Sequence, residues 1–297
     1  MSVHDQTLLV TGAAGHLGRR VVELALEGGV GKVVAATREP EKLADLAARG
    51  AEVRKADFND PASLAAAFKG VDRLLIVSTD SLASGQRLGQ HTAAVAAAVK
   101  AGVKHVLYTS MLNPEPGSAI PFASDHYGTE QAMERSGLGW TILRNSWYAD
   151  NLFGSLPQVL ASGKWYTSAG EGRLAHVARE DAARAAAAAL ASTSTANARY
   201  DITGAKALTT AEIAKLASEV FGKPIEVVAV NDAQLGAGMA AAGVPVAFVP
   251  LYVAFDANTR AGGVDVVSNA VEKLSGRPPQ SLRDFFIQHR AAFMPKG

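Results

Sequence analysis

The chain of 297 residues contains no cysteine, which excludes disulfide bonds and thiolate chemistry. It also has little charge, with 19% charged residues, a net charge of +1 and no run of basic residues. Phosphate backbones are bound by clustered Lys and Arg, so this balance argues against nucleic acid as a partner. His, Asp and Glu show no cluster at metal-ligand spacing, and we expect no metal site.

Long uninterrupted hydrophobic runs are missing as well. The longest apolar segments are alanine tracts broken by charge, such as AREDAARAAAAAL, which predict buried helices and not membrane spans. The first residues, MSVHDQ, lack the charged flank and apolar stretch of a signal peptide. We therefore expect a cytoplasmic protein that acts without a membrane partner.

Apolar residues make up 48% of the chain, which is enough for a sizeable core. In residues 1–146, short apolar segments alternate with helical ones, which is typical of a parallel sheet covered on both faces. We predict a Rossmann-type, doubly wound α/β domain there. Its predicted strands are 7–12, 32–38, 51–58, 73–79, 105–110 and 140–146, and its predicted helices are 17–27, 41–50, 60–70, 86–102 and 124–136.

The alternation loosens after residue 146. Residues 147–297 are predicted to complete the sheet in part and to form a smaller mixed α/β substrate lobe. The predicted elements of this region are a strand pair near 164–176, a helix at 179–192, a strand at 199–204, a helix at 209–221, a strand at 225–230, and then helices and loops.

A glycine-rich loop joins the first predicted strand to the first helix. In VTGAAGHLGRR, Gly12, Gly15 and Gly18 have G-x-x-G-x-x-G spacing. Glycines allow a tight turn and let a pyrophosphate approach backbone N–H groups, while the helix N-terminus favours negative charge. Between a strand and a helix this spacing predicts a dinucleotide site. The predicted loop contacts are Gly12, Ala14, Gly15, His16, Leu17 and Gly18.

The end of the second strand indicates which dinucleotide binds. NAD sites usually place an acidic residue there, whereas this chain has Thr37 and Arg38. A guanidinium matches a 2′-phosphate in charge and geometry. We predict NADP(H), with Arg38 on the 2′-phosphate. The alternative is that Arg38 is a solvated loop charge, since Glu39 and Glu41 are close in sequence.

Several segments together resemble the NmrA-like group of atypical short-chain dehydrogenases/reductases, and within it the bacterial NADPH-dependent quinone and triphenylmethane reductases. The resemblance covers essentially the whole chain, and HYGTE and LRNSWYADN are its most specific parts. The segments that carry it are TGAAGHLG, TREPEKL, ADFND, GVDRLLIVST, AAVKAGVKHVLYTS, SDHYGTEQAMERSGLGWTILRNSWYADN and VAREDAARAAAAAL.

This resemblance implies roles for residues outside the glycine loop. Asp57 and Phe58 would border the adenine, and Ser78 and Thr79 would line the coenzyme channel. The residues that would pack near the nicotinamide and shape the substrate pocket are Asn145, Trp147 and Tyr148. Arg179 would contact the coenzyme or begin a helix.

The superfamily's catalytic residues are only partly matched. Ser110 and Tyr127 fit the serine and tyrosine positions, but Gln131 replaces the lysine that lowers the tyrosine pKa. Tyr127 should then stay protonated, able to donate to a carbonyl but not to act as a base near neutral pH. It is a candidate catalytic donor or a packing residue, and His126 is a second candidate donor or a histidine bonded to backbone.

The predicted activity is NADPH-dependent hydride transfer to a quinone or a related conjugated or aromatic carbonyl compound. A quinone yields a stabilised hydroquinone anion, so positioning alone can suffice. The alternatives are a ketone/alcohol oxidoreductase using Ser110 and Tyr127, and a non-catalytic NADP(H)-sensing regulator. The apolar segment 244–255 is a candidate pocket wall, core segment or homodimer contact.

Overall fold

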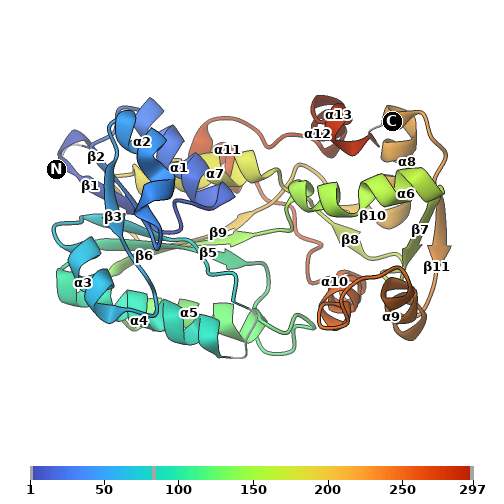
Figure 1. The fold of residues 1–297 in the computed structure, drawn as a ribbon, viewed down its shortest axis with the longest axis horizontal. Helices are drawn as coiled ribbons and strands as arrows, with labels where there is room; N and C mark the ends of the chain where they lie inside the picture. Colours follow the sequence, from blue (N-terminus) through green and yellow to red (C-terminus); the bar gives the residue numbers. More distant parts are fainter. Residues whose placement is uncertain (1–2, 82–84, 295–297) are drawn as a thin grey trace.

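The structure is a computed structural model that describes residues 3–81 and 85–294. Its larger part is a seven-stranded sheet in which all neighbouring strands are parallel (Figure 1). This confirms the predicted doubly wound α/β class. The strands, in spatial order, are β3 (Glu52–Lys55), β2 (Lys32–Thr37), β1 (Thr7–Val10), β4 (Arg73–Ile76), β5 (His105–Met111), β6 (Gly139–Asn145) and β9 (Ala198–Ile202).

The strand order reverses its direction along the sheet between β1 and β4. In open parallel sheets, ligands bind in the crevice outside the carboxyl ends of the strands at such a switch point. The switch point lies directly beside the glycine loop, because Gly12 follows β1 by two residues. The topology therefore places a ligand crevice where the sequence predicts one.

Two helical layers cover the sheet, one on each face (Figure 1). Both enclose large buried apolar clusters, as the solidly apolar strands require. One layer consists of α1 (His16–Glu27), α2 (Ala44–Ala48), α7 (Arg179–Leu190) and α11 (Ala270–Ser275), and the other of α3 (Pro61–Phe68), α4 (Gln86–Ala101) and α5 (Ala123–Glu134). Two short 3-10 helices, η1 (Val3–Asp5) and η2 (Pro40–Leu43), lie in the same half.

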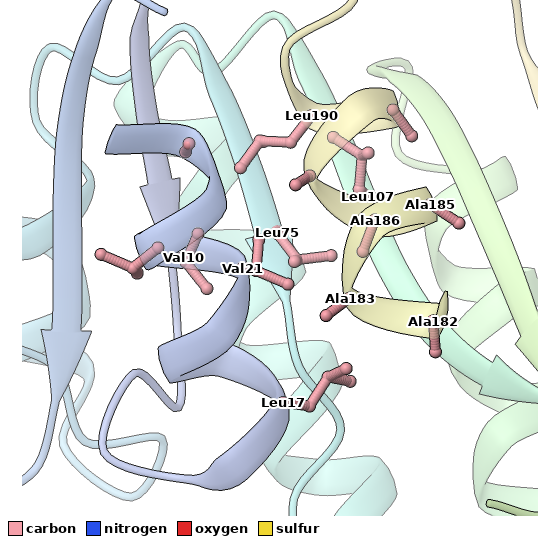
Figure 2. Close-up of a cluster of buried hydrophobic side chains, with 14 of the residues drawn as sticks. Val10, Leu17, Val21, Leu75, Leu107, Ala182, Ala183, Ala185, Ala186 and Leu190 are labelled. Carbon is pink, nitrogen blue, oxygen red and sulfur yellow. The ribbon is translucent and has the colours of Figure 1, made fainter. Parts of the chain in front are cut away.

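The alanine-rich helix α7 packs directly against α1 over the sheet (Figure 2). Alanines of α7, among them Ala183 and Ala186, face Leu17 and Val21 of α1, and all four side chains are buried. Alanine loses no rotamer freedom on burial and leaves room for close helix approach. The tract AREDAARAAAAAL is thus an interior helix of the fold.

The remaining elements form a smaller lobe beyond the carboxyl edge of the sheet (Figure 1). It contains two small sheets, in which β7 pairs with β11 in parallel and β8 pairs with β10 antiparallel. The elements are η3 (Ala149–Gly154), α6 (Leu156–Ser162), β7 (Lys164–Thr167), β8 (Arg173–Leu174), β10 (Leu208–Thr209), α8 (Thr210–Phe221), β11 (Glu226–Ala229), α9 (Asp232–Ala241), α10 (Val249–Arg260), α12 (Leu282–Gln288) and α13 (Arg290–Phe293).

The predicted strand pair near 164–176 is wrong. Both strands exist, but β7 and β8 do not pair with each other, since their partners come from β11 and β10 later in the chain. Residues 147–297 also cross between the two parts of the molecule, because β9 joins the large sheet and α7 and α11 cover it. No helix within residues 3–81 and 85–294 is long and apolar enough to cross a membrane.

The close packing of α1 on the glycine loop gives a first prediction. A Cβ added at Gly18 would lie 2.4 Å from the carbonyl oxygen of Gly12, with no flexible side chain to give way. We expect Gly18→Ala to lower the free energy of unfolding by about 3 kcal/mol, measured by urea denaturation. Gly89→Ala, in the exposed part of α4 with nothing within 4 Å, is the matched control and should stabilise by about 0.5 kcal/mol. Equal effects of the two changes would contradict this packing argument.

Candidate active site

A cavity of about 370 Å³ opens at the carboxyl ends of β1, β2 and β4. It gathers eight residues that the sequence analysis assigned to coenzyme binding: Gly12, Ala14, Gly15, Arg38, Asp57, Phe58, Ser78 and Thr79. The other lining residues are Thr11, Thr37, Glu39, Lys42, Ala56, Asn59, Val77, Asp80 and Gln90. The cavity thus joins five separate segments of the chain at the switch point of the sheet.

The glycine loop forms the cavity wall below α1. Gly12 has a φ of 62°, a left-handed conformation that favours glycine. Gly15 is the N-cap of α1, and no side chain caps the first N–H groups of that helix. These donors are available to an anion at the positive end of the helix dipole.

The rest of the predicted loop contacts lie outside the cavity lining. His16 is exposed at the start of α1, and Leu17 is buried in the core. Gly18 is buried under the Gly12 carbonyl, where it allows the helix to approach the loop. In this structure Leu17 and Gly18 act through packing.

Two cations, Arg38 and Lys42, line the cavity beyond β2. Lys42 pairs with Glu39 at 2.8 Å, and this hydrogen bond lowers the pKa of the Glu39 carboxyl. Arg38 is exposed and forms no hydrogen bond or ion pair within residues 3–81 and 85–294. The Glu39 carboxylate is therefore paired with Lys42, and the Arg38 guanidinium remains available to a ligand.

Asp57, Phe58 and Asn59, which follow β3, form a further wall of the cavity. Asn59 accepts a hydrogen bond from Gln90 of α4 at 3.1 Å, which ties this wall to the second helical layer. Asn59 and Gln90 were not predicted from the sequence. Asn59 directly follows the ADF segment, but nothing local in the sequence brings Gln90 beside it.

Asn145 is the last residue of β6, Trp147 and Tyr148 follow it, and none of the three lines this cavity. The Asn145 amide donates to the Tyr148 hydroxyl at 2.9 Å. Burial raises the pKa of Tyr148 to about 12, so its hydroxyl stays protonated. Trp147 packs on Phe255 of α10 with ring centroids 4.9 Å apart, and its indole nitrogen is buried with no partner in the described part of the chain. Tyr148 packs against the large apolar cluster beneath α1 and α7, whereas Trp147 and Phe255 belong to a separate small cluster.

Arg179 begins α7 and contacts this group. Its backbone N–H donates to Asp150 at 2.8 Å, its guanidinium pairs with the same carboxylate at 3.2 Å, and it lies 5.4 Å from the Tyr148 ring centroid. Arg179 is thus engaged in holding Tyr148 and η3.

Ser110 is committed to a buried ion pair. Its hydroxyl donates to Glu130 at 2.6 Å, and Glu130 is completely buried. Arg144 binds both Glu130 oxygens, at 3.0 and 2.7 Å, and also reaches Glu115 at 2.6 Å. The serine that the resemblance places beside a carbonyl substrate therefore holds Glu130 in this structure.

His126 lies in the interior between α5 and β5. Its Nδ1 is 2.7 Å from the Tyr108 hydroxyl and its Nε2 is 3.0 Å from the Arg87 guanidinium. Burial and the charge of Arg87 lower its pKa well below the ordinary value, so the imidazole is neutral. A neutral ring held on both nitrogens is poorly suited to proton donation, and this geometry favours a structural role.

Tyr127 is half-buried on α5 and does not line the cavity. Its hydroxyl makes no hydrogen bond with any residue that the structure describes. Gln131 bonds along the same helix, donating to Glu134 at 3.0 Å and accepting from Arg135 at 3.0 Å. The residue in the lysine position is therefore engaged on its own helix, and Tyr127 lacks a charged partner.

The polar interior of α4 and α5 is the feature that sequence reasoning largely missed. Its signal is present, since Arg87 and His91 are four residues apart on a helix otherwise rich in alanine. In α5, His126 and Glu130 show the same spacing, which places such pairs on one helix face. A polar stripe on an apolar helix indicates a buried network when two such helices pack together, as α4 and α5 do.

The fold and the site define a class: a Rossmann-type α/β protein with a nucleotide-binding glycine loop at the switch point of its sheet. The chain belongs to the NmrA-like family, which it matches over residues 4–282. The resemblance seen in the sequence is thereby confirmed.

Relatives with known names match nearly the whole chain. "Quinone oxidoreductase 2" of Escherichia coli is 34% identical over 278 residues, covering 93% of this chain and 96% of that protein. "NAD(P)H azoreductase" of Xenophilus azovorans is 30% identical over 290 residues, covering 96% of this chain and 99% of that protein.

Two solved structures share the architecture closely. The Escherichia coli NADPH-dependent quinone oxidoreductase complexed with NADPH has a TM-score of 0.89 at 34% identity, covering 95% of this chain and 99% of that one. Triphenylmethane reductase of Citrobacter sp., complexed with NADP(H), has a TM-score of 0.88 at 34% identity, covering 94% and 99%.

Proposed function

We propose that this protein is an NADPH-dependent oxidoreductase that transfers a hydride to quinones or related conjugated or aromatic acceptors. The observation that carries the proposal is the cavity at the switch point, bounded by the glycine loop on one side and by Arg38 on the other. Its relatives with 30% identity or more include a quinone oxidoreductase and an azoreductase, which supports the same class of reaction.

The residues present fit a dinucleotide with a 2′-phosphate. The uncapped N-terminus of α1 and the left-handed turn at Gly12 suit a pyrophosphate. Arg38 is free of ion pairs among the described residues and would bind the 2′-phosphate, with Lys42 close by. Asp57 and Phe58 would border the adenine.

Ser78 and Thr79 line the cavity between the glycine loop and the end of β5, where the middle of the coenzyme would lie. Asn145, Trp147 and Tyr148 would then hold the nicotinamide end and the acceptor. The Asn145–Tyr148 hydrogen bond and the Trp147–Phe255 contact give this end a fixed aromatic surface on which a flat acceptor can stack.

The bound coenzyme would supply the hydride; the protein's own task is to position the acceptor and to exclude water from it. A quinone that accepts a hydride becomes a hydroquinone anion, in which the negative charge is delocalised over the aromatic ring. Its second proton can come from solvent after the transfer. The step therefore needs no positioned acid.

The geometry favours quinones over ketones, because a ketone gives a basic alkoxide that needs a donor. The hydroxyl of Ser110 is committed to Glu130, and His126 is buried and neutral. Position 131 holds glutamine, so no cation stands there beside Tyr127. No complete acid–base set is present at these three positions.

The apolar segment 244–255 contributes at two places. Phe255 packs on Trp147 and extends the aromatic surface, whereas Val246, Phe248 and Tyr252 are exposed. We propose Phe255 as a wall of the acceptor site and the exposed residues as the contact between two copies in a homodimer. A cytoplasmic location, where NADPH is available, fits this function.

Tyr127→Phe tests the proposed chemistry. We expect kcat/KM for NADPH-dependent reduction of menadione to stay within about threefold of wild type, since no donor is required. Any reduction of a ketone such as acetophenone should fall at least about tenfold, the low end of proton-transfer effects. Coenzyme consumption followed at 340 nm with both acceptors measures this.

The two acceptors control for each other. Equal losses with the quinone and the ketone would show that Tyr127 shapes the pocket instead of donating a proton. A wild-type protein that binds NADPH but consumes none with any acceptor would contradict the proposed reductase and identify a sensor.

A further inference from the structure

Beneath the coenzyme cavity, a buried polar cluster joins α4, α5 and β5. We propose that this cluster, formed by Arg87, His91, Tyr108 and His126, positions residues 79–81, which follow β4, against the bound coenzyme, with His91 as the principal positioning residue. The inference rests on the proposed function, since it assigns the cluster a role in NADPH binding.

The cluster holds residues 79–81 at two points. His91 Nε2 accepts a hydrogen bond from the backbone N–H of Thr79 at 3.0 Å. Arg87 donates to the carbonyl oxygen of Ser81 through Nε at 3.2 Å and Nη2 at 3.0 Å. Between these points lies Asp80, which lines the cavity together with Thr79. The wall of the cavity is therefore fixed from the interior.

His91 also supports a second wall. Its ring meets that of Phe58 edge-to-face, with centroids 6.3 Å apart and an interplanar angle of 87°. Phe58 lines the part of the cavity proposed for the adenine, and Gln90, the neighbour of His91 on α4, also lines the cavity. One buried imidazole thus contacts two cavity residues that are about twenty positions apart in the chain.

The hydrogen bonds fix the proton positions on both histidines. The Thr79 N–H can only donate, so His91 Nε2 must be unprotonated and Nδ1 carries the hydrogen. That hydrogen has two oxygens within reach, Thr129 Oγ1 at 3.0 Å and the Tyr108 hydroxyl at 3.2 Å. The threonine hydroxyl donates onward to the Asp125 carbonyl at 2.7 Å. His91 can therefore accept from Thr79 only while it is neutral.

The same argument applies to His126. Arg87 can only donate, so His126 Nε2 accepts from it and Nδ1–H donates to the Tyr108 hydroxyl at 2.7 Å. Arg87 is held further by the Phe122 ring, with its guanidinium carbon 4.5 Å from the ring centroid. His126, in the HYGTE segment, therefore orients the arginine that holds Ser81.

Burial is consistent with these assignments. His91 is completely buried, and burial with the nearby charge of Arg87 lowers its pKa to about 3. Burial likewise raises the pKa of Tyr108 above its ordinary value. The facing Asp125 has a pKa raised by burial, and the Arg87 charge opposes that shift. No member of the cluster changes protonation near neutral pH, so the support it gives is constant.

An interior of this size could have been filled with apolar side chains, as much of the same face is. A buried polar group lowers the stability of the fold unless it is hydrogen-bonded. Here each ring nitrogen of His91 and His126 has a hydrogen-bond partner. The cluster uses those partners to orient backbone groups of the cavity wall. A cluster that only fills the interior would affect stability alone, whereas a cluster that positions the cavity wall would also affect NADPH affinity.

His91→Leu tests the inference, because leucine is apolar and leaves the Thr79 N–H without an acceptor. We expect NADPH to bind about tenfold more weakly, measured by isothermal titration calorimetry, as for the loss of one hydrogen bond. At saturating NADPH, kcat with menadione should stay within about threefold, because the acceptor site is intact. His91→Gln, which offers an acceptor oxygen, should recover affinity to within about threefold.

His105→Leu is the matched control. His105 is also buried and neutral, but it begins β5, at the opposite end of that strand from the cavity, and bonds to Thr141 at 2.8 Å. The His105→Leu change should lower thermal stability while leaving NADPH affinity within about twofold of wild type. An equal loss of affinity in His91→Leu and His105→Leu would overturn the inference, as would unchanged affinity in a folded His91→Leu.

If His91→Leu does not fold, Thr129→Val replaces it, since valine matches threonine in shape but removes the nearer acceptor of the His91 Nδ1–H and leaves it the Tyr108 hydroxyl at 3.2 Å. NADPH binding should then weaken at least about threefold, and unchanged binding would overturn the inference. The wild-type titration separates the two proposals: a wild type that binds no NADPH refutes the proposed function itself. Binding by the wild type with equal binding by the cluster variants refutes only the positioning role.

Discussion

Arg38→Ala should raise the KM for NADPH about 100-fold and leave the KM for NADH within about twofold, because hydrogen bonds to a charged group contribute about 1.5–3 kcal/mol. The two coenzymes differ only in the 2′-phosphate. In this protein the guanidinium lies in the cavity with no ion-pair partner among the described residues, while the neighbouring carboxylate of Glu39 is paired with Lys42. Initial rates with menadione and varied coenzyme measure both constants.

The controls separate charge from geometry. Arg38→Lys keeps the charge without the planar fork, and its KM for NADPH should lie between those of the wild type and of Arg38→Ala. Arg135→Ala removes an exposed arginine whose side chain, among the described residues, bonds to Gln131 of α5 alone, and it should change neither constant. If Arg38→Ala raised the two constants together, Arg38 would not distinguish the coenzymes and the assignment of NADP(H) would be wrong.

The parts of the site that are continuous in sequence could be predicted from it. The glycine loop, the β2 end with Arg38, the Asp57–Phe58 pair and the β4 end each follow a strand directly. Since parallel strands bring their carboxyl ends to one edge, local reasoning was enough to bring these segments together at one cavity. The strand and helix order, and with it the Rossmann-type class, followed from the same alternation.

Pairings between distant segments could not be predicted. Local alternation identified β7 and β8 as strands, but their partners are set by how the lobe packs. Ser110 matched a catalytic position, yet its hydroxyl bonds to Glu130, twenty residues away on α5. The role of Tyr127 and of His126 in catalysis stays a prediction that only kinetics can test.

Buried histidines give the second large effect, a loss of stability in mild acid. His91, His105 and His126 are each at most 4% exposed. Burial lowers the pKa of His91 to about 3 and that of His105 to about 4, and it lowers the pKa of His126 well below the ordinary value. In the unfolded chain all three return to about 6.5.

The sign follows from which state binds more protons. Between the unfolded value near 6.5 and the folded values, the unfolded chain is protonated and the folded protein is not, so stability falls as pH falls. The stability that these neutral histidines contribute is fully present above about pH 6.5. Below that pH, each histidine lowers the free energy of unfolding by about 1.4 kcal/mol per pH unit. Burial raises the pKa of Asp125 and Asp201, which acts in the opposite direction.

We therefore expect a net loss of about 3 kcal/mol between pH 7 and pH 5.5, a large part of the 5–15 kcal/mol that is typical of a folded domain. Urea unfolding at closely spaced pH values measures this slope. His105→Gln keeps a hydrogen-bonding group toward Thr141 but cannot titrate. The slope of its free energy of unfolding against pH should therefore be smaller than that of the wild type by the contribution of about one proton. A flat profile from pH 7 to pH 5.5 in the wild type would show that these histidines are not held neutral. The cluster proposed to support the coenzyme cavity would then lose its physical basis, because a protonated His91 cannot accept from Thr79.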